Sequence, residues 1–168
     1  MVCYGINNRG YTLIEIIAVS AIIGAVSAIG MPAIISQVPK MRLKAAVREI
    51  VEQMQLARYK AVNTNREHRI VFTNNAYPQA DSYRVERDDA GGWEGEPVIV
   101  KGETKLPGDA NIFDITFPSS PPVCEFNTNG TSGSGAVYIK LKDTEEKEYK
   151  ITADSLTGKI TLQDITKG

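Results

Sequence analysis

One carboxylate stands apart from the other acidic residues of this sequence, because it opens a long uncharged stretch. Glu15 follows a single base, Arg9, and residues 16–38 carry no charge. A carboxylate at the edge of an apolar membrane helix is costly unless it is paired or reaches the interface. Glu15 therefore needs a partner for its charge, and the stretch behind it supplies none.

Candidates for catalysis or metal binding are sparse. His68 is the single histidine, and the two cysteines, Cys3 and Cys124, fit no zinc-binding spacing. Residues 129–135 are rich in glycine but lack the Gly-Lys-Ser/Thr ending of a phosphate-binding loop. Residues 143–148 are acidic but lack the ligand spacing and turn glycine of an EF-hand loop. We therefore expect no enzymatic activity, no metal site and no cofactor.

The composition bounds the class of protein. The 168 residues suffice for one domain and an appendage. Lys and Arg number 19 against 20 Asp and Glu, which gives a formal net charge of -1. A general nucleic-acid binder would need a basic patch, so this balance argues against one.

The uncharged stretch is long enough to cross a membrane, since a helix over residues 16–38 would span roughly 35 Å. A secretory signal peptide could use the small residues 18–21 or 25–28 as a cleavage site, but the apolar run continues well past both. A plain signal anchor explains the length and leaves Glu15 without a role. A third interpretation explains both features.

The segment Gly10-Tyr11-Thr12-Leu13-Ile14-Glu15 resembles the processing site of type IV prepilins and type II secretion pseudopilins. The resemblance implies that residues 1–10 are a leader peptide. It also implies that a prepilin peptidase in the membrane cuts between Gly10 and Tyr11 and methylates the new amino terminus. Tyr11 departs from the commoner phenylalanine but keeps an aromatic ring.

The resemblance assigns Glu15 a role in subunit docking. Cleavage would leave a positive amino terminus at Tyr11, and inside an apolar helix bundle this charge needs a counterion. Glu15 of a neighbouring subunit can supply one, because opposite charges attract strongly in a low dielectric. The alternative is a carboxylate held near a helix amino terminus by the helix dipole.

Residues 11–39 are expected to form a transmembrane helix that becomes the core of a filament. Gly24 and Ala28 lie four residues apart on one face, a spacing of small residues that lets helices approach closely. Pro32 removes an intrahelical hydrogen bond and should kink the helix. Gly24 and Pro32 also fall where related major pilins carry a glycine and a proline, between which the helix can unwind.

Residues 40–168 are expected to form a periplasmic head of α+β class, in which an amphipathic helix packs on a mainly antiparallel sheet. Within residues 40–63 the apolar positions recur at steps of three and four. They are Leu43, Val47, Ile50, Met54, Ala57 and Ala61. Later residues alternate with a period of two between turn signals. The expected strands are 68–73, 82–88, 97–101, 111–117, 123–127, 136–142, 148–153 and 159–163, the last two forming a hairpin.

The head carries a second resemblance, to the GspH/FimT minor pseudopilins. It rests on residues 56–62, Phe126-Asn127, Gly130, the strand 137–141 and residues 151–160. The resemblance implies a minor subunit at or near the tip of a type II secretion or type IV pilus filament, which helps to initiate assembly. Its partners would be other pilins or pseudopilins and an assembly platform in the inner membrane.

A rival function is DNA binding for uptake in natural transformation, as in some FimT-like minor pilins. It would need basic residues on an exposed loop or tail. The carboxyl-terminal end offers Lys159 and Lys167 against Asp164, which is thin support. We therefore expect no nucleic-acid partner.

Overall fold

The computed structural model describes residues 11–75, 79–89, 93, 97–142 and 148–165, without the side chains of residues 29, 30, 32, 33 and 148. The chain divides into two compact units, Met1–Val38 and Pro39–Gly168. The predicted leader 1–10, with Gly10, lies outside the described residues.

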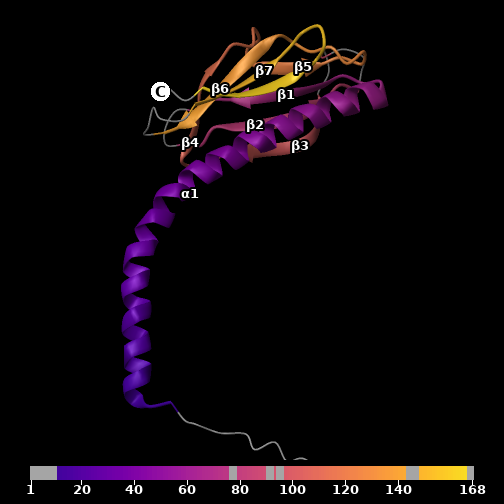
Figure 1. Cartoon of the computed structure of the whole chain (residues 1–168). Helices are drawn as coiled ribbons and strands as arrows, with labels where there is room; N and C mark the ends of the chain where they lie inside the picture. The colour runs from indigo at the N-terminus through magenta and orange to yellow at the C-terminus, as the bar shows by residue number, and fades with distance from the viewer. Residues whose placement is uncertain (1–10, 76–78, 90–92, 94–96, 143–147, 166–168) are drawn as a thin grey trace, which may run out of the picture. The chain divides into compact units, whose positions relative to one another are not determined.

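A single helix, α1, runs from Leu13 to Thr64 and belongs to both units (Figure 1). Thr12 caps its amino terminus, because the Glu15 amide donates to the Thr12 hydroxyl at 3.3 Å and to the Thr12 carbonyl at 3.1 Å. Pro32 lies within α1 and does not end the helix. It ends where Asn65 adopts a left-handed conformation, with φ of 51°.

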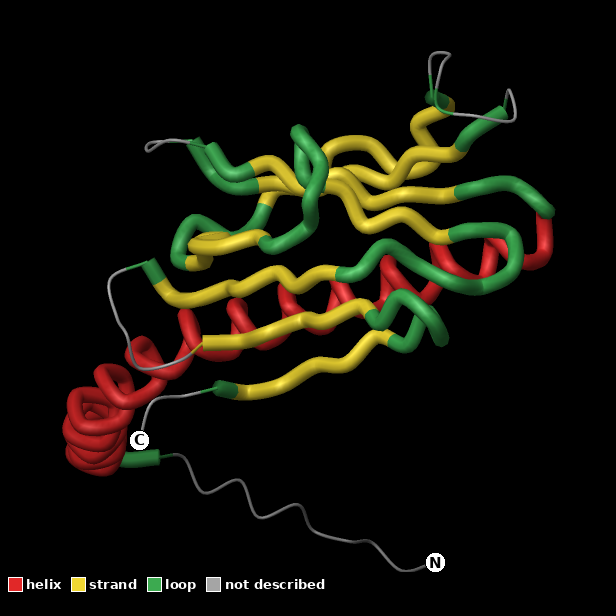
Figure 2. Tube along the Cα trace, turned by 90° about the horizontal axis from the view of Figure 1, so that it is seen from above, coloured by secondary structure: helices red, strands yellow, loops and turns green. Residues whose placement is uncertain are grey.

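The described residues contain eight strands, which form two antiparallel sheets rather than the one sheet expected from the sequence (Figure 2). Sheet A has the order β3-β2-β1-β5 and sheet B the order β4-β6-β7-β8. The strands are β1 His68–Thr73, β2 Ser82–Arg87, β3 Val98–Lys105, β4 Ala110–Ile115, β5 Val123–Phe126, β6 Gly135–Leu141, β7 Glu148–Ala153 and β8 Ile160–Asp164. The predicted strands agree with these to within four residues at each end, and the predicted terminal hairpin is the β7–β8 pair.

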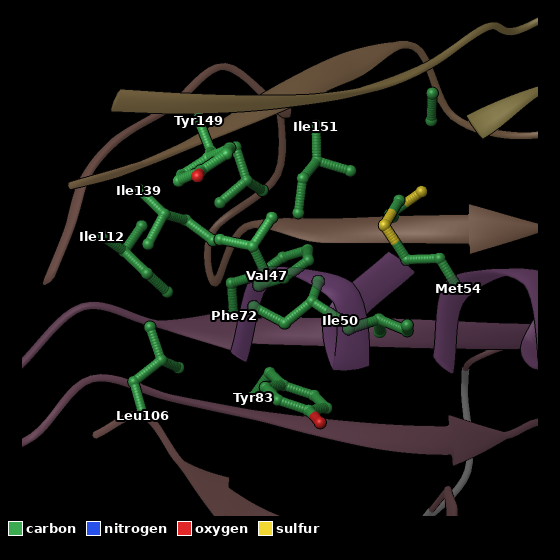
Figure 3. Close-up of a cluster of buried hydrophobic side chains, with 14 of the residues drawn as sticks. Val47, Ile50, Met54, Phe72, Tyr83, Leu106, Ile112, Ile139, Tyr149 and Ile151 are labelled. Atoms are coloured by element: carbon green, nitrogen blue, oxygen red, sulfur yellow. The ribbon is translucent and has the colours of Figure 1, made fainter. Parts of the chain in front are cut away.

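The two sheets and the second half of α1 enclose one hydrophobic core (Figure 3). All six residues of the predicted apolar stripe, Leu43 to Ala61, are at most 1% exposed. Val47, Ile50 and Met54 point from the helix toward side chains of both sheets, which include Phe72 of β1 and Ile151 of β7. The period of this stripe therefore predicted the face of the helix that the head buries.

Candidate functional site

The first unit carries the predicted docking residues on a helix whose large apolar side chains are exposed. Tyr11 is 79% exposed, and Glu15 is exposed as well. The large apolar residues of this unit with at least half of their surface exposed are Leu13, Ile14, Ile16, Ile17, Val19, Ile22, Ile23, Val26, Met31, Ile34 and Ile35. An apolar surface of this extent marks contact with lipid or with other protein chains.

The Glu15 carboxylate lies in the first turn of α1, three residues after the Thr12 cap. The partial positive charge of a helix amino terminus favours a carboxylate there. Among the residues that the structure describes, none supplies a hydrogen-bond or ion-pair partner for this carboxylate. Glu15 can therefore help to start the helix and still accept a cation from another chain.

The sequence prediction missed the role of Thr12 as the cap. The signal was present, since Ser or Thr followed three residues later by Glu before an apolar run is the pattern of a capping box.

Gly24 and Ala28 line one shallow apolar groove along the helix, together with Ser27, Met31 and Ile35. A Cβ atom added at Gly24 would meet no atom within 4 Å. The described part of the chain therefore leaves room for a side chain at this position. The structure describes only the backbone of Pro32, which lies within α1.

A search of the described residues for a helix long and apolar enough to cross a membrane finds none.

In the head, hydrogen bonds from Arg58 join three residues of the second resemblance, Arg58, Gly130 and Thr157. The Arg58 Nε donates to the Gly130 carbonyl at 3.0 Å, and its guanidinium also donates to the Thr157 carbonyl at 2.8 Å. Gly130 and Gly158 both have positive φ, of 83° and 60°. One helix side chain thus joins two turns that lie 72 and 99 residues further along the chain. This arrangement stabilises the head and contains no group suited to catalysis.

The residues considered for chemistry in the head are buried or structural. Burial lowers the pKa of His68, whose Nδ1 lies 2.9 Å from the Arg66 carbonyl oxygen. Burial also raises the pKa of the Cys124 thiol far above its usual range, so this thiol is unreactive at neutral pH. Within the described part of the chain, no group of three metal-ligating side chains occurs. The acidic segment 143–148 lies outside that part, apart from the backbone of Glu148.

Comparison with protein families gives two matches that together cover most of the chain. The family model described as type II transport protein GspH matches residues 46–157. The model described as the prokaryotic N-terminal methylation motif matches residues 6–31, which include Gly10, Tyr11 and Glu15. Among curated proteins, none matches the sequence significantly.

Solved structures with a similar fold include the minor pseudopilin EpsH from the type 2 secretion system of Vibrio cholerae. It is 14% identical, with a TM-score of 0.53 over 76% of this chain and 98% of EpsH. The type IV minor pilin FimU of Pseudomonas aeruginosa is 17% identical, with a TM-score of 0.51 over 72% of this chain and 92% of FimU. These likenesses confirm the predicted α+β fold.

Proposed function

This chain belongs to the GspH family of type II transport proteins, which makes it a structural protein rather than an enzyme, and we propose that it is a minor pseudopilin. In this proposal the chain is packed at or near the tip of a periplasmic filament and helps to initiate its assembly. The observation that carries the proposal is that a methylation motif and a GspH head occur together in one chain.

Maturation begins at the junction of Gly10 and Tyr11. A prepilin peptidase hydrolyses this peptide bond, which releases residues 1–10, and then transfers a methyl group to the new amino terminus. The match to the methylation motif supports this step. The products are a chain that begins with an exposed aromatic residue and a positive charge four residues ahead of Glu15.

Assembly then uses the exposed half of α1. We infer that the helix is held in the inner membrane with the head in the periplasm, and that it leaves the lipid to pack against other pseudopilins on an assembly platform. Gly24 and Ala28 allow a neighbouring helix to approach closely. The amino terminus of an incoming subunit pairs with Glu15 of its neighbour, and the low dielectric around the pair makes an unpaired charge costly.

A Glu15→Val variant tests the docking role. We expect it to be inserted in the membrane and cleaved like the wild type but not to be incorporated into filaments. Processing is checked by mass spectrometry of the amino terminus, and incorporation by immunoblotting of sheared filaments. A matched control is Glu52→Val, which removes an exposed carboxylate from the head portion of the same helix. Normal incorporation of Glu15→Val would contradict the docking role.

A further inference from the structure

Each sheet of the head has two edge strands, and these edges differ in how far they are closed to further pairing. An edge strand presents unpaired backbone groups that can bind another strand, so proteins usually disrupt or cover them. The edges are β3 and β5 in sheet A, and β4 and β8 in sheet B.

The edge of β3 is closed to further strand pairing by its irregular register and by its lysines. Its pairing with β2 shifts register between Tyr83 and Val85 and again between Val85 and Glu86. Such bulges twist an edge away from a regular partner, and lysines on an edge discourage pairing. β3 carries Lys101 and Lys105, and Lys101 is held by the Glu49 carboxylate at 2.8 Å.

Strand β4 is closed by side chains from the β1–β2 connection. The Ile112 amide donates to the Asp81 carboxylate, and the Ile112 carbonyl accepts from the Asn74 side-chain amide, both at 2.7 Å. These are the backbone groups of Ile112 that an added strand would need, so the centre of this edge is already occupied.

Strand β5 is closed by the chain that follows it. β5 has four residues. The Gly133 amide donates to the Glu125 carbonyl at 2.8 Å, and Phe126 forms a bridge with Ser132. The short strand therefore has little free edge left.

Strand β8 differs from the other three. Its register with β7 is unbroken over all five residues, and it lies outermost in Figure 2, next to the chain end marked C. The Asp154 amide donates to the Lys159 carbonyl at 3.0 Å, so Lys159 forms a hydrogen-bonded pair with the β7 side. In an antiparallel ladder every second residue forms such a pair, so the next ones in β8 are Thr161 and Gln163. The backbone groups of Ile160 and Leu162 consequently point away from β7. No described strand pairs with that side of β8.

We propose that this edge pairs with the β8 edge of a second copy of the chain, antiparallel and centred on Thr161. In this register Ile160 of each copy lies opposite Leu162 of the other, and Thr161 lies opposite itself. Lys159 lies opposite Gln163 on the same face as Thr161. Apolar side chains then meet apolar ones, a threonine pair forms at the centre, and no like charges lie opposite each other.

The alternation of the ladder agrees with this register. Ile160 and Leu162, whose backbone groups point outward, form the hydrogen-bonded pairs, and Thr161 occupies the non-hydrogen-bonded position. Leu162 is 38% exposed in the single chain, and the second copy would cover it further. A register centred on Leu162 would instead place Asp164 opposite the apolar Ile160.

The pair has two-fold symmetry and is therefore closed, so it cannot propagate into a filament. The proposal concerns two copies of the chain outside any filament and does not rest on the proposed function. Failure of Glu15→Val to dock would leave it unaffected.

Cysteine substitution at three positions of the full-length chain tests the proposal. Thr161→Cys, Leu162→Cys and Gln163→Cys are made with Cys3→Ser, while the buried Cys124 is kept. Opposed Cα atoms at a non-hydrogen-bonded position lie about 4.5 Å apart, within the range of a disulfide. In the proposed register two Gln163 residues lie roughly 13 Å apart along the strands.

We expect mild oxidation of membranes containing Thr161→Cys to give a disulfide-linked homodimer at about tenfold or more the yield of Gln163→Cys. Non-reducing electrophoresis measures the yield, and mass spectrometry identifies the linked peptides. Equal yields at positions 161 and 163, the highest yield at Leu162→Cys, or a Thr161→Cys disulfide only with a different protein would each overturn the proposal. Circular dichroism confirms that each variant is folded.

Discussion

Gly158 shows how one residue can be required by contacts that lie far away in the sequence. Its φ of 60° is a conformation that residues with a side chain rarely adopt. A Cβ atom there would lie 2.1 Å from the Gly130 carbonyl oxygen and 2.7 Å from Arg58 Nε. The absence of a side chain thus allows Arg58 to reach both turns.

We expect Gly158→Ala to lower the free energy of unfolding by about 2 kcal/mol or more, because it adds backbone strain to a clash with Gly130 and Arg58. Urea denaturation of the full-length chain in detergent measures the change. The control is Gly108→Ala, since a Cβ at Gly108 would meet nothing within 4 Å. Equal losses in the two variants would contradict this assignment.

Glu86 is a buried carboxylate between two arginines of sheet A. Its side chain is 2% exposed, and Arg69 Nε donates to it at 2.7 Å while Arg84 donates to its other oxygen. Burial alone would raise the pKa of Glu86, but the hydrogen bonds from Arg84 and Arg69 outweigh it and lower the pKa below 4.5. A lowered pKa in the folded state means that the ionised group contributes stability above pH 4.5 and loses it as the pH falls.

We therefore expect Glu86→Gln to lower the free energy of unfolding by about 2 kcal/mol at pH 7. The difference from wild type should shrink as the pH falls below about 4.5, because the wild-type carboxyl is then protonated too. Urea denaturation at a series of pH values measures this, with the exposed Glu52→Gln as control. A difference that stays constant down to pH 3 would exclude the ion pairs as its source.

Among the elements, α1 consists of two successive parts whose side chains need different surroundings. The part of α1 in the head buries a single stripe, from Leu43 to Ala61, and none of the polar residues of this part is fully buried. The part before Val38 exposes apolar side chains such as Ile16 and Ile35. Helical hydrogen bonding is common to both parts, so the surroundings that each part needs are set by its side chains.

A buried side chain also connects the two sheets. Asp81 is the last residue of the β1–β2 connection and is 4% exposed. Its carboxylate accepts from the Asn75 amide at 2.8 Å and from the Ile112 amide of β4 at 2.7 Å. One side chain therefore ties sheet A to the edge of sheet B.

Replacing Asp81 with alanine should leave both amides without an acceptor in the interior. We expect a loss of about 3 kcal/mol in the free energy of unfolding and faster hydrogen exchange at the Ile112 amide. Denaturation and amide-exchange mass spectrometry measure the two effects. The control is Asp114→Ala, which removes an exposed carboxylate from β4, the strand of Ile112. It should change neither the free energy of unfolding nor the exchange rate at Ile112. An unchanged rate of exchange at the Ile112 amide in Asp81→Ala would show that the Asp81 carboxylate does not hold this edge of sheet B.

At the scale of the whole molecule, the two units have separate tasks in the proposed function. The first carries the processing site and Glu15, and the second has a core of its own made from residues after Pro39. The methylation motif and the GspH model match these two parts separately. The DNA-uptake alternative is tested by neither match, so the expected absence of a nucleic-acid partner stays a prediction.

Features that depend on a local pattern could be predicted from the amino-acid sequence. The spacing of Leu43 to Ala61 predicted the buried face of α1, and alternation between turn residues predicted every strand. The segment from Gly10 to Glu15 predicted the methylation motif, and the second resemblance, in the head, predicted the GspH family; the matches confirm both. These features can be predicted because each depends on residues close together in the sequence. Helices repeat every 3.6 residues, strands every 2, and the motif is short.

The pairing of the strands and the closure of the sheet edges became visible only in the folded chain. Nothing local to β5 indicates that it pairs with β1, 50 or more residues earlier, while β6 joins the other sheet. Arg58 and Gly158 likewise acquire their roles from contacts between distant segments. Strand pairing is chosen by long-range packing and hydrogen bonding, which the period of a single strand does not record.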